Sequence, residues 1–201
     1  MGDPSWIRKN LPPYDYAICA DGGIRYLDLL GIDVDLIVGD FDSAPKDILE
    51  NYKKSQTPII TYPVDKDKTD TQIAVDFAME KGASQVYLLG VLGTRWDHSY
   101  ANIMLLHRLE KNGVKAQILH SNNIVMLSNK ALKINGKIGQ FVSLLPFGGE
   151  VHISSTEGLK YPIYGKTLPM DFPIGISNVL TASQAVVNIK SGWLIAVLAQ
   201  D

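Results

Sequence analysis

Two aspartates separated by one residue, Asp40 and Asp42, form the most chemically suggestive pair in the sequence. They follow the apolar run 34–38, and a helical pattern begins shortly after them, near Pro45. Two carboxylates held this close repel each other unless a cation or hydrogen-bond donors compensate. Mg²⁺ is a usual partner of carboxylate oxygens in proteins. Acidic residues placed to suit a helix N-terminus give the same pattern, so the pair alone leaves both interpretations open.

Two further stretches carry side chains of the kind that hold phosphate groups. Residues 65–72 mix aspartates and lysines before a helical pattern, and residues 90–98 are glycine-rich around Arg95. Lysine, arginine, glycine-rich backbone and helix N-termini suit a polyphosphate, and aspartates suit its metal ion. Thr69 and Gln72 also have the form of a capping box, so helix capping alone would explain these two residues.

Each of the three stretches lies between a strand-like run and a helical pattern. In an open α/β sheet such loops emerge at the carboxyl ends of parallel strands, where ligands bind, so we expect them to lie together. A short helical turn is expected at 4–9. The expected strands are 16–20, 34–38, 59–62, 85–89 and 116–120, and the expected helices are 24–30, 45–54 (with Ser43 as N-cap), 70–81 (with Thr69 as N-cap) and 97–111.

The sequence after residue 121 changes character, because helical periodicity disappears and short apolar runs alternate with turn residues. Seven such runs predict an all-β sandwich or barrel. Asn135-Gly136 is a strong hairpin signal. We therefore predict an α/β N-terminal domain with a mostly parallel sheet (1–121) and a β-sandwich or barrel C-terminal domain (122–201). The predicted strands are 124–127, 132–134, 140–145, 151–153, 159–164, 185–189 and 193–198, with turns at 135–136, 148–149 and 191–192.

Bulk composition is that of an ordinary globular protein, with 46% hydrophobic residues and a net charge of −2. That balance indicates neither a nucleic-acid partner nor a membrane partner. Fourteen of the 16 aspartates precede residue 98, which fits a metal-dependent front half. The single cysteine, Cys19, rules out an internal disulfide and fits a reducing compartment. Without a long apolar run or a secretory signal, the chain is predicted to be cytoplasmic.

Three familiar motifs are not present in the sequence. The Asp-Gly-Gly run at 21–23 is not the G-x-G-x-x-G dinucleotide fingerprint. The Gly-Lys-Thr run at 165–167 resembles the end of a P-loop, but Lys160 stands where the first glycine is required. His98 and His107 have no nearby cysteine or histidine partner in the sequence, so no zinc site is expected.

Taken together and in order, these stretches resemble the thiamin pyrophosphokinase family. The resemblance runs from about residue 16 to the end of the chain, and the ordered set is more specific than any one motif. The motifs that carry it are Ala20-Asp21-Gly22-Gly23, Gly39-Asp40-Phe41-Asp42-Ser43, 65–72, Gly93-Thr94-Arg95-Trp96-Asp97-His98, 156–162 and Gly175-Ile176-Ser177-Asn178.

The resemblance implies an α/β domain, a β-sandwich domain and a homodimer. It implies transfer of the pyrophosphoryl group of ATP to thiamine, giving thiamine diphosphate and AMP, with Mg²⁺. The implied metal ligands are Asp40, Asp42 and Asp70, and the implied catalytic residues are Asp70, Asp42 and Arg95. The implied ATP-binding residues are Asp21, Gly22, Gly23, Lys66, Lys68, Thr69, Gln72, Arg95 and Asp97, and the implied thiamine-binding residues are Ser177 and Asn178.

The chain departs from the family pattern in two places. The family usually has another strand, ending in glycines, ahead of the segment that begins at Ala20, but the 15 residues before Tyr16 show no strand pattern. Either the start of the sequence is truncated or the sheet has one strand fewer than in the family. Part of the nucleotide pocket would be built differently in the two cases. Thr94 stands where the family often has glycine, and a positive φ there would be strained.

Two other functions remain open from the sequence. A pyrophosphokinase of the same fold that acts on a pterin or a thiamine analogue would share the front half, and the loop 156–178 would distinguish it. A non-catalytic nucleotide-binding or thiamine-binding protein would bind ATP without releasing AMP. A plain α/β protein with capped helices would carry these motifs only by coincidence.

Overall fold

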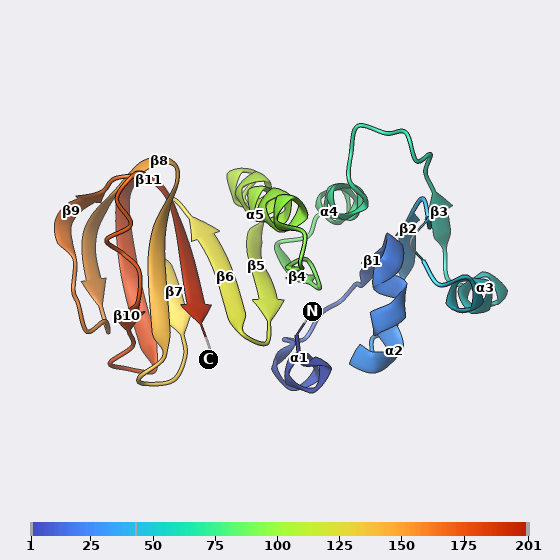
Figure 1. Cartoon of the computed structure of the whole chain (residues 1–201), viewed down its shortest axis with the longest axis horizontal. Coiled ribbons are helices and arrows are strands. Elements are labelled where there is room, and N and C mark those ends of the chain that lie inside the picture. Colours follow the sequence, from blue (N-terminus) through green and yellow to red (C-terminus); the bar gives the residue numbers. More distant parts are fainter. Residues whose placement is uncertain (1, 43, 200–201) are drawn as a thin grey trace.

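The structure is a computed structural model that describes residues 2–42 and 44–199. The molecule is elongated, with short strands and helices at one end and long, bent strands at the other (Figure 1). Ser43, the predicted N-cap of the helix after the acidic loop, lies outside the described residues. Among the residues that the structure describes, no helix is both long enough and apolar enough to span a membrane.

A three-stranded parallel sheet forms the end of the molecule that carries the acidic loop. Its elements are β1 (Ile18–Ala20), η1 (Asp21–Tyr26), α2 (Leu27–Leu30), β2 (Leu36–Gly39), α3 (Lys46–Lys54), β3 (Ile59–Thr61) and α4 (Asp70–Glu80). The strand order is β1-β2-β3, with Ile37 opposite Cys19 and Ile59. Alternate residues of β2 face opposite layers. Ile37 packs with η1, α2 and α3, whereas Val38 packs with Ile73 of α4.

The remaining strands belong to a second sheet, which begins within the predicted N-terminal domain. It contains β4 (Gln85–Leu89), β5 (Lys115–His120) and β6 (Asn123–Ser128), and α5 (Trp96–Lys111) packs against β5 and β6. The pair β4–β5 is parallel, and β6 pairs antiparallel with β5. The expectation of one parallel sheet is therefore wrong in this respect, because β4 and β5 join the strands of the C-terminal half and not β1.

Two long strands organise the C-terminal half. The elements are β7 (Leu132–Asn135), β8 (Phe141–Glu157), β9 (Tyr164–Leu168), β10 (Asn178–Val179) and β11 (Gln184–Ala199). The main path is β10-β8-β11-β6-β5-β4, with β7 on β11 and β9 on β8. A single apolar core gathers residues from β6 to β11, among them Ile134, Leu144, Ile153 and Leu194.

Several turn predictions in this half are wrong for a common reason. Gly148, Gly149 and Gly192 adopt positive φ inside β8 and β11, where they bend the strands instead of ending them. Two pairs of predicted strands thus merge into β8 and β11. The hairpin predicted at Asn135-Gly136 does not form, because β7 pairs with β11 and the backbone N–H of Gly136 donates to the carbonyl of Ser183. The predicted strand 159–164 overlaps β9 only at Tyr164, because β9 begins there.

The N-terminal segment begins with the predicted helical turn, α1 (Pro4–Asn10). Asp3 caps it by accepting a hydrogen bond from the Ser5 backbone N–H at 2.8 Å. Ile7 is fully buried against Leu30 and Leu119, so this segment packs between α2 and the second sheet.

The single cysteine is a core residue. Cys19 is buried in β1, and burial raises the pKa of its thiol to about 12. A thiol held in this way is protonated at neutral pH and is a poor nucleophile.

Candidate active site

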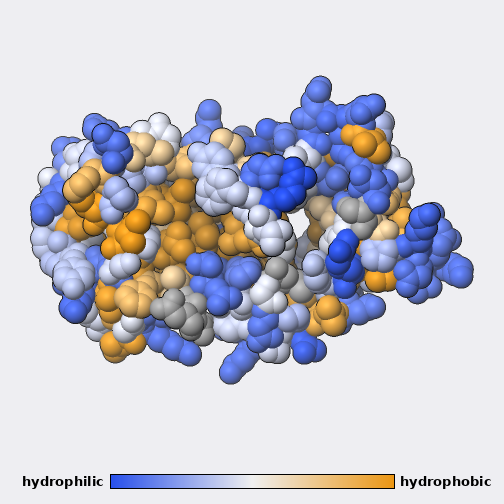
Figure 2. All heavy atoms as spheres, viewed as in Figure 1, coloured by the Kyte–Doolittle hydropathy of each residue, from blue (hydrophilic) through white to orange (hydrophobic). Residues whose placement is uncertain are grey.

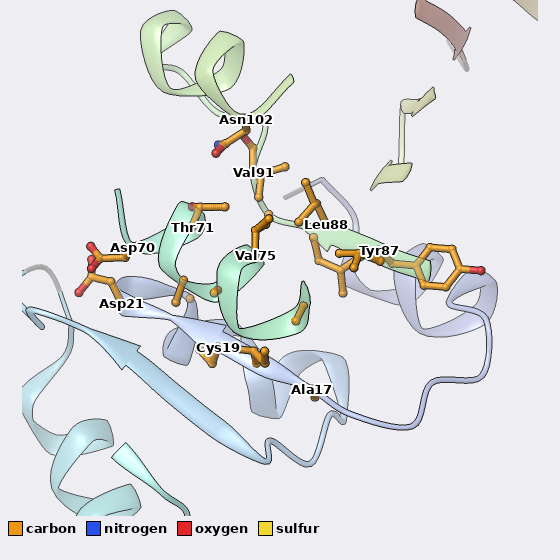
Figure 3. A pocket seen from close by; sticks show the side chains of 18 of the residues that line it. Ala17, Cys19, Asp21, Asp70, Thr71, Val75, Tyr87, Leu88, Val91 and Asn102 are labelled. Carbon is orange, nitrogen blue, oxygen red and sulfur yellow. The ribbon is translucent and has the colours of Figure 1, made fainter. Parts of the chain in front are cut away.

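Three carboxylates from three segments converge at the carboxyl edge of the small sheet. Asp21 follows β1, Asp40 follows β2, and Asp70 is the first residue of α4. Each offers an oxygen, and these oxygens lie within 4.8 Å of one another. Figure 3 shows Asp21 and Asp70 side by side at one end of a pocket. This set differs from the predicted metal set by one residue, because Asp42 is exposed while Asp21 lies within the group.

The backbone brings Asp21 and Asp40 together through a close contact with Gly39. A Cβ at Gly39 would lie 3.0 Å from the Cα of Asp21, and Gly39 has φ +155°. Asp21 itself has φ 42°, a conformation that costs energy in a residue with a side chain. The close contact with Gly39 thus holds Asp21, in a strained backbone conformation, next to the end of β2.

Lys66 lies between two of the carboxylates. Its Nζ is 2.6 Å from Asp40 Oδ2 and 3.1 Å from Asp70 Oδ1, and it also donates to the carbonyl of Pro63. The side chains of Lys66 and Asp40 are only 12% and 11% exposed. The lysine therefore serves as an internal counter-ion for the acidic cluster.

The surroundings shift the pKa values of Asp40 and Asp70 in opposite directions. The hydrogen bond from Lys66 lowers the pKa of Asp40 below its usual value, against the effect of burial. Burial raises the pKa of Asp70, and the charges of Asp40 and Asp21 add to this, so the opposing ion pair with Lys66 does not restore the usual value. Burial acts to lower the pKa of Lys66, but its hydrogen bonds to both carboxylates outweigh it and the pKa is raised. Of these two carboxylates, Asp40 therefore has the lowered pKa and Asp70 the raised one.

The donor set fits a hard divalent cation. Three carboxylate oxygens from Asp21, Asp40 and Asp70 match the ligands that Mg²⁺ takes in proteins. Lys66 holds part of that coordination space, so a metal ion would share or replace its contacts.

The second predicted loop contributes unevenly to this cluster. Thr69 caps α4 by accepting from the Gln72 backbone N–H at 3.1 Å, as predicted. Lys68 turns away and pairs with Asp76 at 2.8 Å, and Asp76 also binds Arg108 at 2.7 Å. The predicted ATP-binding residue Lys68 is therefore engaged in a separate ion network, although it lines the same cavity.

The third predicted loop lies across a cavity of about 1150 Å³ from the acidic cluster. Arg95 makes a two-point ion pair with Asp97, at 2.6 and 3.3 Å, and both side chains are mostly exposed. The residue before it, Thr94, is not among the described residues with positive φ, so the expected strain does not arise. Cavity-lining residues from the predicted set are Asp21, Gly22, Gly23, Asp40, Lys66, Lys68, Thr69, Asp70 and Arg95, whereas Asp42, Gln72, Asp97, Ser177 and Asn178 do not line it.

Two buried polar residues of α5 hold this loop and were not predicted. Ser99 Oγ accepts from the Gly93 backbone N–H at 3.0 Å and donates to the Arg95 carbonyl at 3.1 Å. Asn102 Nδ2 donates to the Val91 carbonyl at 2.9 Å. The available signal was two polar side chains, three residues apart, on the inner face of an otherwise amphipathic helix.

The two predicted thiamine-binding residues lie in the C-terminal half. Asn178 is buried, and it accepts from the Tyr161 backbone N–H and donates to the Tyr161 carbonyl, so it joins β10 to the segment before β9. Ser177 is exposed with φ 58°, and its N–H donates to Ser143 Oγ. Asn178 also lines a small cavity of about 240 Å³ beside Tyr161 and Ile176.

The fold and the acidic cluster define a general class of protein. Carboxylates, a lysine that is mostly shielded from solvent and helix starts at the carboxyl edge of a parallel sheet are features found in α/β proteins that bind phosphate groups. Sequence profiles described as "Thiamin pyrophosphokinase, catalytic domain" and "Thiamin pyrophosphokinase, vitamin B1 binding domain" match residues 7–118 and 128–194. The chain belongs to the thiamin pyrophosphokinase family.

Individual relatives agree with this assignment. The thiamine pyrophosphokinase of Bacillus subtilis (strain 168) is 29% identical over 182 residues, covering 90% of this chain and 85% of that protein. Thiamine pyrophosphokinase 3 of Oryza sativa subsp. japonica is 28% identical over 200 residues, covering 87% of this chain and 74% of that protein. The crystal structure of the Bacillus subtilis enzyme superposes with a TM-score of 0.89 at 25% identity, covering 100% of this chain and 96% of that chain.

Proposed function

We propose that this protein transfers the pyrophosphoryl group of ATP to thiamine, giving thiamine diphosphate and AMP. The observation that carries the proposal is the convergence of Asp21, Asp40, Asp70 and Lys66 on one cavity, in a chain of this family. The cavity also takes in the Arg95 loop, so groups suited to a metal ion and groups suited to phosphates border the same space.

The triphosphate of ATP is assigned to the charged side of this cavity. Lys66 and Arg95 supply positive charge, and the glycines after β1 let a phosphate approach the backbone. Lys68 can contribute only by leaving Asp76, its present partner. The residues proposed to contact ATP are Asp21, Gly22, Gly23, Lys66, Lys68, Thr69 and Arg95, which line the cavity, together with Gln72 and Asp97, which do not line it.

Mg²⁺ is the proposed metal, held by Asp40, Asp42 and Asp70, with Asp21 added because its oxygen lies in the same group. Asp42 belongs to this proposal as a neighbour on the Asp40 loop, where its backbone N–H donates to Asp40 Oδ1 at 3.3 Å. A bound Mg²⁺ would offset negative charge on the phosphate oxygens.

The chain's own residues account for orientation and proton transfer. The hydroxyl oxygen of thiamine attacks the β-phosphorus, and the bond from that phosphorus to the oxygen bridging the α-phosphorus breaks, so this oxygen leaves with AMP. Such transfers depend on positioning and charge neutralisation. Asp70 takes the hydroxyl proton, since burial gives it the raised pKa of a better base. Arg95 and Lys66 stabilise the charge that develops on the phosphate oxygens.

Thiamine is proposed to bind beside Ser177 and Asn178, where a second copy of the chain completes the site. Exposed apolar side chains on the same loop, Met170, Phe172 and Ile176, support a contact surface there.

The test is AMP release from ATP and Mg²⁺, with and without thiamine, measured by chromatography. We expect AMP and thiamine diphosphate in equal amounts, only when thiamine is present. AMP release that requires a pterin or a thiamine analogue would instead identify a different acceptor. ATP binding in calorimetry with no AMP from any acceptor would identify a binding protein and contradict the proposal.

A further inference from the structure

An ion network joins the loop before α4 to two helices. Asp76, on α4, accepts from Lys68 Nζ at 2.8 Å through Oδ2 and from Arg108 Nη2 at 2.7 Å through Oδ1. Lys68 precedes α4, and Arg108 lies in the last turn of α5. One carboxylate thus connects the loop with both helices, which lie side by side (Figure 1).

The three side chains of this network differ in exposure. The Asp76 side chain is only 13% exposed, whereas those of Lys68 and Arg108 are 52% and 44% exposed. Hydrophilic residues also cover much of the surface around the small sheet, in contrast to the apolar area over the C-terminal half (Figure 2). A shielded carboxylate depends on its partners, while a half-exposed cation can exchange its partner for water or for another anion. Asp76 is therefore the shielded centre of the network, and the two cations are its exchangeable partners.

The two cations also differ in what they can reach. Lys68 lines the cavity of about 1150 Å³ that holds the acidic cluster, whereas Asp76 and Arg108 do not line it. A lysine carries its ammonium on a flexible four-carbon stem, so Lys68 can turn into the cavity while its backbone stays in place. Of the two partners of Asp76, Lys68 is therefore the one that a ligand in the cavity can take.

We propose that Asp76 is a positioning residue that holds Lys68 away from the phosphate site until a nucleoside triphosphate binds, and that Arg108 makes the release of Lys68 possible. When Lys68 transfers to a phosphate oxygen, Asp76 keeps Arg108 as its counter-ion and is not left as an unpaired, shielded charge. Affinity for the polyphosphate is then set by a competition between Asp76 and the ligand for one lysine. This inference rests on the proposed function, since it concerns the same phosphate site.

The competition gives changes at Asp76 and Arg108 opposite effects on binding. Removing the charge of Asp76 frees Lys68, so a polyphosphate should bind more tightly. Removing the charge of Arg108 leaves Lys68 as the cation that Asp76 retains, so transfer of Lys68 would leave the carboxylate unpaired and binding should weaken. A network that only holds α4 against α5 would give both changes the same sign, because either one breaks the link between the helices.

The experiment measures how the full chain binds an ATP analogue that has a methylene group between the α- and β-phosphorus atoms. Pyrophosphoryl transfer cannot break this bond, so calorimetry with Mg²⁺ and without thiamine measures binding alone. The variants are Asp76→Asn, Arg108→Gln and Lys68→Met, and each of the first two is also combined with Lys68→Met. Glu80→Gln on α4 and Lys111→Gln on α5, both at exposed positions, are the matched controls for the change in net charge.

Relative to these controls, we expect the Kd to fall by about 3–10-fold in Asp76→Asn and to rise by about 3–10-fold in Arg108→Gln. Both shifts should shrink to within ~2-fold when Lys68→Met is present, because the competition needs the lysine. Shifts of the same sign, or shifts that persist without Lys68, would assign the network a structural role and overturn the proposal. Each pair with Lys68→Met is a complete cycle, so either one decides the outcome if urea unfolding shows that the other variant is not folded.

AMP release separates this inference from the proposed function. A chain that releases AMP with thiamine, but whose variants lack the opposite shifts, keeps the function and overturns only the role of Asp76. Opposite shifts in a chain that releases no AMP with any acceptor would support the role of Asp76 and contradict the function. A wild-type chain that does not bind the analogue would contradict both.

Discussion

Two acid–base clusters border the same cavity, and they differ in burial. Asp40, Lys66 and Asp70 are mostly shielded from solvent, whereas Arg95 and Asp97 are 70% and 64% exposed. Both clusters shift the pKa values of their members, since the hydrogen bond between Arg95 and Asp97 raises the pKa of the arginine and lowers that of the aspartate. Water can replace a lost partner at the exposed pair, whereas a shielded charge depends on each partner. We therefore expect substitutions in the shielded cluster to change activity more than substitutions in the exposed pair.

The largest expected effect comes from removing one shielded carboxylate. Asp40→Asn keeps the shape but removes the charge that Lys66 and a metal ion require, so kcat/KM should fall by about 10²–10³. Asp97→Asn should change it less than tenfold, because Arg95 remains exposed and available. Steady-state AMP release measures both variants. Equal losses would remove the distinction between the clusters.

A second comparison separates the two possible metal sets. Asp21→Asn should raise the Mg²⁺ concentration needed for half-maximal activity by roughly tenfold, because its oxygen lies in the carboxylate group. Asp42→Asn should raise it less, since Asp42 is exposed in this arrangement. A larger effect of Asp42→Asn than of Asp21→Asn would favour the metal ligands predicted from the sequence, Asp40, Asp42 and Asp70.

A third change tests whether Lys66 acts as the internal counter-ion. Lys66→Met leaves Asp40 and Asp70 facing each other without a cation, so the free energy of unfolding without metal should fall by about 1–3 kcal/mol. Mg²⁺ should restore part of this loss. Urea unfolding with EDTA and with Mg²⁺ measures both effects, and Lys53→Met, which breaks an exposed pair with Glu50, is the matched control. Equal destabilisation by the two variants would contradict the role of Lys66.

The smallest effect concerns the helix that carries Asp70. Thr69→Ala removes the cap of α4 and should cost about 1 kcal/mol of unfolding free energy. Thr69→Ser keeps the accepting oxygen and should recover most of it. If both variants unfold at the same urea concentration, the hydroxyl does not stabilise the start of this helix.

Local signals predicted most elements, and long-range pairing limited the rest. Glycine at 31 ends α2 in a left-handed conformation, and Thr69 caps α4, because both depend on residues within one turn. The division between β1 and β4 was not predictable in this way, since strand order depends on neighbours that are distant in sequence. Gly148 and Gly192 were read as turns, but a positive φ also bends a continuous strand.

The site residues were likewise predictable only where they depend on local sequence. The sequence placed the acidic loops at strand ends, and this needed only the alternation of strands and helices. That Asp21 and not Asp42 joins Asp40 depends on the contact between Gly39 and Asp21, which no spacing reveals. Ser99 and Asn102 were missed because their partners are backbone groups of a loop.

The position of β6 has a practical consequence for how the protein can be divided. It pairs with β5 on one side, at four positions from Asn123 to Met126, and with β11 on the other, at six positions from Asn123 to Ser128. A cut near residue 121 would remove the antiparallel partner of β5 and expose the apolar side chains of Ile118 and Leu127 to water. The two halves are therefore unsuitable as interchangeable modules. We expect neither to express as a stable fragment, and chimaeras with relatives should be joined elsewhere.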